Sequence, residues 1–149
     1  MNSCKIAEVV ATSTDLPPVT VVVLSLNAEN PITGWPSKHY VPVLHLRCQQ
    51  KATQAYIDVG MASNVEYGHD GATVTLRFDK AAATKQHMAQ STDREALFFS
   101  QAVATIKQMT AHSTMLFEFV PFNASPAMTT FNLTGLAEAV KPLREACKW

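Results

Sequence analysis

The sequence predicts an α+β fold: an antiparallel β-sheet, a meander of about 5–7 strands, with one central helix at about 93–111 and a C-terminal helix at about 135–147 packed on it. Three observations support this class. Several short segments alternate apolar and polar residues with a period of two, and turn residues separate most of them. Two other segments repeat apolar residues at helical spacing.

The first predicted strand follows a polar N-terminal leader. We assign residues 1–18, which end in a proline pair, to the leader, and residues 19–149 to a single domain. The segment TVVVLSLNA, residues 20–28, places Leu24 and Leu26 on the same face of a strand. This run is too short and too rich in β-branched residues to span a membrane as a helix, so we expect a buried strand.

The next three alternating segments predict consecutive strands joined by short turns. In VPVLHLRCQQ, Cys48 lies on the apolar side of the strand, while His45 and Arg47 lie on the other side. ATQAYIDVGM and ATVTLRFDK continue the alternation, and the turn EYGHDG separates them. We therefore expect an antiparallel meander.

The central helix follows a segment that fits a strand or a loop. Residues 80–93 show neither period clearly. Thr92 is followed three residues later by Glu95, which predicts a capping box at the start of the helix at 93–111.

The C-terminal part of the chain returns to a strand pattern and then to a helix. Residues 114–122 and 128–135 alternate again, and they are joined by NASPA. In the helix at 135–147, Pro142 either produces a kink or opens a new turn.

Composition and charge disfavour several classes of partner. Apolar residues make up 47% of the chain and charged residues only 16%, and 12 basic residues balance 12 acidic ones. Without net charge there is no field to attract nucleic acid or anionic lipid, so we predict neither partner. The N-terminus lacks the pattern of a signal peptide, which favours a cytoplasmic location unless a leader preceded this sequence.

The three cysteines leave the redox state open. In an exported protein two of Cys4, Cys48 and Cys147 would pair and one would remain free, whereas in the cytoplasm all three would stay reduced. No C-x-x-C pair is present, so we predict no zinc site and no other metal or cofactor.

No catalytic constellation stands out, and we predict no catalytic residues. Ser91 and Asp93 with nearby His87 are the residue types of a hydrolytic triad, but capping explains the serine and no G-x-S-x-G elbow surrounds it. Arg77 and Asp79 share one face of a strand, and Arg47 is a candidate to lie across from them. An ion pair is the simpler expectation for these residues, and an anion site is the alternative.

Exposed aromatic residues suggest recognition of another molecule. The loop NPITGWPSKHY presents Trp35, His39 and Tyr40 among prolines, and FVPFNASPAM places Phe122 at a proline-containing turn. Rigid aromatic side chains are favoured interface anchors, so these four are the candidate binding residues. Packing of Trp35 onto an open end of the core is the alternative.

Four segments in order resemble the VasI/TagO family of type VI secretion-associated exported proteins: LHLRCQQKATQAYIDVG, ATVTLRFDK, STDREALFFSQAVATIKQM and TTFNLTGLAEAVKPLREACKW. The similarity covers residues 19–149. It implies an extracytoplasmic, periplasmic domain in which Cys48 and Cys147 form a structural disulfide. A bridge that closes a loop of about 100 residues would contribute on the order of 4–5 kcal/mol.

The resemblance favours a non-enzymatic accessory or binding module that acts through contacts with another protein or the cell envelope. One alternative is an inhibitor or exclusion factor encoded by a phage or mobile element on the same fold. Another is a small hydrolase, which would require a pocket that gathers His45, His87 or the aspartates.

Overall fold

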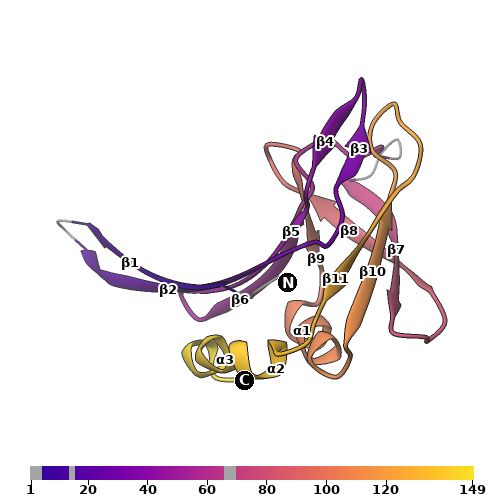
Figure 1. The fold of residues 1–149 in the computed structure, drawn as a ribbon. Helices are drawn as coiled ribbons and strands as arrows, with labels where there is room; N and C mark the ends of the chain where they lie inside the picture. The colour runs from indigo at the N-terminus through magenta and orange to yellow at the C-terminus, as the bar shows by residue number, and fades with distance from the viewer. Residues whose placement is uncertain (1–4, 14–15, 66–69) are drawn as a thin grey trace.

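The described residues form one large antiparallel sheet and three short helices. The helices lie at one end of the sheet (Figure 1). The computed structural model describes residues 5–13, 16–65 and 70–149, so Cys4 and most of the turn predicted at 66–71 lie outside the described residues. Within the described residues, nine strands form this sheet in the order β1-β2-β5-β6-β9-β8-β7-β10-β11. Their bounds are β1 Lys5–Ser13, β2 Leu16–Asn27, β5 Val43–Gln49, β6 Ala52–Asp58, β7 Gly71–Phe78, β8 Thr84–Gln90, β9 Ala96–Phe99, β10 Thr114–Phe119 and β11 Ala127–Asn132.

The α+β class and the antiparallel sheet are confirmed, but the sheet has more strands than the 5–7 predicted and is not a simple meander. β5 and β6 form the expected hairpin, but β6 pairs next with β9 and not with β7. The connection after β6 buries Val59 and Met61 in the core. Two positions in the sheet separate β6 from β7, the next strand in the sequence. β7 therefore enters the sheet farther along, and β8 and β9 return to fill the gap.

The central helix is shorter than predicted because its first part is a strand. Residues 96–99 form β9, and helix α1 spans Ala102–Thr110. The predicted capping box does not form. Instead Ser91 and Asp93 organise a tight turn, in which Asp93 Oδ1 accepts the Glu95 N–H at 2.9 Å. Alternation of the residues after the turn buries Leu97 and Phe99, so pairing with β6 and β8 outweighs the local helical signal.

The C-terminal helix is divided in two. Helix α2 spans Leu136–Ala139 and helix α3 spans Lys141–Cys147. Pro142 lies in the first turn of α3, where its missing N–H leaves no hydrogen bond unmade. Of the two alternatives for Pro142, the opening of a new helix is the one observed. None of the helices within the described residues is long and apolar enough to cross a membrane.

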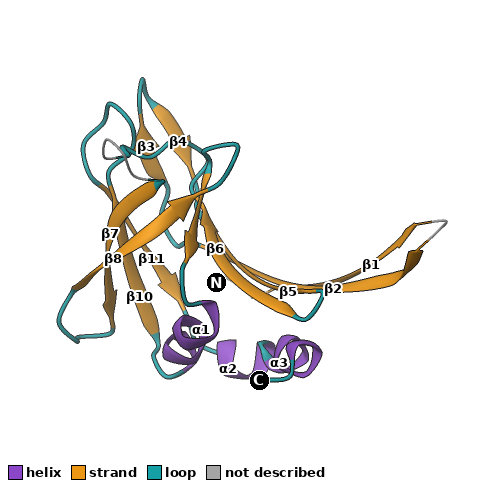
Figure 2. Cartoon of the chain, turned by 180° about the vertical axis from the view of Figure 1, so that it is seen from behind, coloured by secondary structure: helices purple, strands orange, loops and turns teal. Residues whose placement is uncertain are grey.

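Two segments acquire strand structure that the sequence left open or assigned elsewhere. Residues 84–90, in the ambiguous segment, form β8. Residues 5–13, assigned to the leader, form β1, which pairs with β2, and this pair extends away from the rest of the sheet in Figures 1 and 2. The division of the chain at residue 18 stays a prediction.

The sheet curls until its far edge meets the chain that leaves β2. The Glu29 N–H donates to the Thr130 carbonyl at 2.9 Å, and the Thr129 hydroxyl donates to the Asn30 carbonyl at 2.7 Å. The curl encloses one apolar core. Fully buried side chains from most of the strands contribute to it, among them Leu24, Leu44, Leu46, Ile57, Leu76, Phe117, Phe119 and Phe131.

The two ends of the curled sheet differ in structure. The three helices lie at one end (Figure 2). At the other end, which we call the apex, lie the hairpin of β3 (Ile32–Gly34) and β4 (Lys38–Tyr40), residues 59–65 and the loop 120–126. The apex therefore brings together three segments that are far apart in the sequence.

The turn between β5 and β6 offers a test of the fold. Gln50 and Lys51 both adopt positive φ, at 51° and 60°, a conformation that Asn and Gly adopt at lower cost. We expect the double variant Gln50→Asn/Lys51→Gly to raise the free energy of unfolding by about 1 kcal/mol in urea denaturation. An unchanged or lower value would show that this turn is not strained in the folded protein.

Candidate functional site

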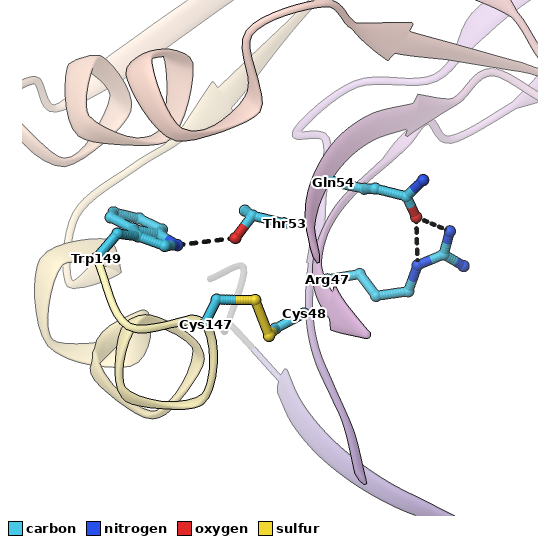
Figure 3. The surroundings of a disulfide bond; sticks show 6 residues. All are labelled: Arg47, Cys48, Thr53, Gln54, Cys147 and Trp149. Carbon is cyan, nitrogen blue, oxygen red and sulfur yellow. Dashed lines mark hydrogen bonds between the residues drawn. A yellow bond between two sulfur atoms is a disulfide. The ribbon is translucent and has the colours of Figure 1, made fainter. Parts of the chain in front are cut away.

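A disulfide and the contacts of Trp149 fix helix α3 to the sheet at the helical end, and we call these contacts the clasp (Figure 3). Cys48 on β5 and Cys147 on α3 form a disulfide with a Cα–Cα distance of 5.9 Å, the pairing that the resemblance implied. The Trp149 indole N–H donates to the Thr53 hydroxyl at 2.8 Å, and Arg144 and Lys107 lie over its ring at 5.2 and 5.8 Å from the centroid. These contacts fix α3 against β5 and β6, so the clasp has a structural role.

Removal of this bridge tests the contribution of the clasp. We expect the variant Cys48→Ala/Cys147→Ala to lose up to about 4–5 kcal/mol of unfolding free energy, because the open chain gains entropy. Equilibrium denaturation measures the loss, and Thr53→Ala, which removes only the contact to Trp149, should cost about 1 kcal/mol. Equal losses in the two variants would contradict the dominant role of the disulfide.

The outer face of the sheet carries a row of stacked rings. The rings of His45 and Tyr56 lie 5.0 Å apart, and those of Tyr56 and Phe98 lie 4.6 Å apart. Burial lowers the pKa of His45, and its Nδ1 lies 2.8 Å from the Ser25 hydroxyl. Arg47 lies beside this row, where it donates to Gln54 Oε1 across the hairpin on the side opposite the disulfide (Figure 3).

The anion site considered for Arg47, Arg77 and Asp79 is not assembled. Strands β6, β9 and β8 separate β5 from β7, so Arg47 does not lie across from the other two. Arg77 Nε donates to the Ala81 carbonyl at 3.0 Å. Asp79 binds the start of β10: it accepts the N–H groups of Ser113 and Thr114 at 3.0 and 2.9 Å.

The residues considered for a hydrolase are engaged in separate local contacts. The Ser91 hydroxyl donates to Asp93 Oδ1 at 2.6 Å, and His87 Nε2 lies 3.0 Å from Asp70 Oδ1. His45 belongs to the stacked row on the outer face. Within the described residues, no group of three or more His, Cys, Asp or Glu side chains could hold a metal ion.

The carboxylate of Asp79 makes the free energy of unfolding depend on pH. Partial desolvation raises its pKa, but hydrogen bonds from Thr114, His112 and Ser113 outweigh this and lower the pKa below its ordinary value. The carboxylate therefore stabilises the folded state above its unfolded pKa of about 3.9, and this contribution disappears as the pH falls through the lower folded value.

We expect Asp79→Asn to have a lower Tm than the wild type at pH 7, because the amide accepts these hydrogen bonds less strongly. Thermal unfolding between pH 2 and pH 7 should show the difference shrinking below about pH 4. Asn tolerates the positive φ of 51° at this position, so the comparison isolates the charge. A difference independent of pH would contradict this account.

The apex brings together two of the four predicted binding residues. Trp35 and Phe122 are each 59% exposed, the largest exposed fractions among the large apolar side chains of the described residues. They line the same hollow of about 240 Å³, together with Lys38, Met61, Ala62, Glu95 and Pro121. Pairing of residues 62–64 with 120–122 holds Phe122 in place: its N–H donates to the Ala62 carbonyl at 2.9 Å.

The other two predicted binding residues lie nearby on β4 but in different surroundings. The Tyr40 hydroxyl donates to Asp58 Oδ2 at 2.9 Å, and burial together with Asp58 raises the pKa of Tyr40 to about 12. Its ring covers Gly60, where a Cβ would meet ring atoms at 2.5 Å. His39 is exposed, with Nδ1 3.0 Å from the Thr33 hydroxyl. Whether any of the four residues binds a partner stays a prediction.

Phe122 also lines a second hollow at the apex, of about 470 Å³, with Ser63, Asp70, Gln90 and Arg94 among its lining residues. Sequence reasoning missed Ser63 and Arg94 because neither belongs to a recognisable motif. The one available signal was Arg94 in the segment STDRE, which the capping-box interpretation had assigned to a helix.

Fold and site together define a disulfide-closed antiparallel sheet domain with helices across one end and exposed aromatic residues at the other. The chain belongs to the VasI family: the family described as type VI secretion system VasI, EvfG, VC_A0118 matches residues 8–149, nearly the whole chain. This confirms the resemblance and identifies a type VI secretion-associated protein. No curated protein and no solved structure matches the chain.

Proposed function

We propose that this protein is a non-enzymatic accessory module of a type VI secretion system that acts outside the cytoplasm by binding another protein through its apex. The observation that carries the proposal is the pair Trp35 and Phe122, two highly exposed aromatic side chains that line one hollow. Exposed aromatic residues that gather in a rigid setting are typical of interface anchors, because they contribute a large contact area at a small entropic cost.

Three further features support parts of this proposal. The disulfide is typical of proteins that fold in an oxidising compartment. The balance of 12 basic and 12 acidic residues makes nucleic acid an unlikely partner class on electrostatic grounds. The serine, histidines and aspartates weighed for a hydrolase form separate local hydrogen bonds, which favours a binding role over an enzymatic one.

The apex also suits the second candidate function, an inhibitor or exclusion factor encoded by a mobile element. Such a factor would bind one host protein tightly through exposed apolar residues, and Trp35 and Phe122 supply them. The identity of the bound protein separates the two functions: a secretion-system component supports the first and an unrelated host protein supports the second.

The experiment is cross-linked co-purification of the native protein from the cell envelope, followed by measurement of the Kd for the protein identified. We expect Trp35→Ala and Phe122→Ala each to weaken binding at least about tenfold. Met128→Ala is the matched control, because Met128 is 55% exposed but does not line the Trp35 hollow. Wild-type affinity in both apex variants would exclude the apex as the binding surface.

A further inference from the structure

We propose that the second hollow at the apex, beside Phe122, binds an acidic side chain, Asp or Glu, of the partner protein. The inference rests on the proposed function and deepens it by naming the chemistry that the partner presents. It depends on two residues that line this hollow: Arg94, which carries a guanidinium, and Ser63, which carries a hydroxyl.

Arg94 supplies a positive charge that is not engaged within the described part of the chain. Neither a hydrogen bond nor an ion pair of its guanidinium occurs among the described residues. Its backbone, in contrast, is held on both sides: the Arg94 N–H donates to the Ser91 carbonyl, and Gln90 Nε2 donates to the Arg94 carbonyl, each at 3.0 Å. The turn thus fixes the backbone position of Arg94, and the charge of its side chain is available to a ligand.

The backbone conformation of Arg94 allows a test of its side chain. The residue adopts φ 65°, in the left-handed region where glycine is free of strain and a residue with a Cβ is not. A turn at this position would be more stable with glycine, so an Arg94→Gly variant can remove the guanidinium without destabilising the turn.

Ser63 supplies a hydrogen-bond donor without a partner. The residue is only 4% exposed, and its Oγ is the buried side-chain oxygen or nitrogen that lacks a hydrogen-bond partner among the described residues. A buried hydroxyl without a partner costs stability, so such groups are rare in folded proteins and call for a specific reason. Because Ser63 lines the hollow, rotation of its side chain would let a carboxylate bound there accept this hydrogen bond.

The acidic groups near Arg94 are already hydrogen-bonded. Asp70, which lines the same hollow, has Oδ1 at 3.0 Å from His87 Nε2. Asp93 accepts the Ser91 hydroxyl and the Glu95 N–H, and the first of these is the main reason for its lowered pKa. Within the described residues, neither carboxylate forms an ion pair with Arg94.

Phe122 explains why an amino-acid side chain fits better than a free anion. Phe122 is an apolar residue in the lining of the hollow and is 59% exposed. It can cover the methylene groups of Asp or Glu while Arg94 and Ser63 bind the carboxylate. The volume of about 470 Å³ leaves room for the neighbouring residues of the partner's segment.

Two variants test the proposal, because each should change stability and binding in opposite directions. Arg94→Gly removes the guanidinium and relieves the left-handed strain, and Ser63→Ala removes the buried hydroxyl. We expect both variants to fold with an unchanged or higher Tm and yet to bind an acidic ligand at least about tenfold more weakly, the loss expected for a charge-assisted hydrogen bond. A purely structural role for either residue would lower the Tm.

Lys51→Gly is the matched control for Arg94→Gly. Lys51 is also a cationic residue at positive φ, with φ 60°, so the control removes one charge and relieves similar strain. It lies in the β5–β6 turn, at the opposite end of β6 from the apex. Equal weakening by Lys51→Gly and Arg94→Gly would show that only the net charge matters and would overturn the proposed site.

The probe is the blocked peptide acetyl-Ala-Glu-Ala-amide, compared with its Gln counterpart by NMR titration of the isotope-labelled protein. We expect saturable shifts of the Ser63, Arg94 and Phe122 amide signals with the Glu peptide and none with the Gln peptide. The absence of shifts with the Glu peptide, or identical shifts with both peptides, would overturn the proposal.

The partner-binding experiment separates this inference from the proposed function. If Trp35→Ala weakens binding of the partner while Arg94→Gly and Ser63→Ala do not, the acidic-residue site is wrong and the apex function stands. If none of the three variants weakens binding, the proposed function itself is wrong, whatever the peptide titration shows.

Discussion

Two hydrogen bonds, from Glu29 to the Thr130 carbonyl and from Thr129 to the Asn30 carbonyl, join the last strand of the sheet to the chain that leaves β2. This contact closes the curled sheet, whose inward-facing side chains form one core. Curling also protects much of the β11 edge and divides the molecule into two ends. The positions of the helices and of the exposed aromatic residues both follow from that division.

The two ends meet different physical requirements. At the helical end, α1, α2 and α3 cover apolar side chains that would otherwise be exposed, and the Cys48–Cys147 bridge together with Trp149 holds α3 in place. At the apex, short loops leave Trp35 and Phe122 exposed and Ser63 without a partner. The covalent bridge is therefore at one end, while the features that suit recognition are at the other.

Local sequence predicted the strands well where one face is buried. Leu24 and Leu26 are buried as expected, and Cys48 lies on the apolar side of β5 with Arg47 on the other. It failed at residues 93–99, because Leu97 fits both helical spacing and strand alternation. The strand forms because a position in the sheet is open between β6 and β8, and that position is open because β7 pairs farther along the sheet. The aromatic candidates Trp35 and Phe122 were accessible to sequence reasoning, whereas Arg94 and Ser63 were not.

By itself the sequence determined the α+β class, most strand positions and, through resemblance, the family and the cysteine pair, because alternation and motif order are local properties of the chain. Tertiary structure alone decided the strand order, the curl of the sheet and the gathering of residues 35, 63, 94 and 122 at one end. These features depend on contacts between residues far apart in the chain. No local pattern records such contacts, since they arise only when the whole core is enclosed.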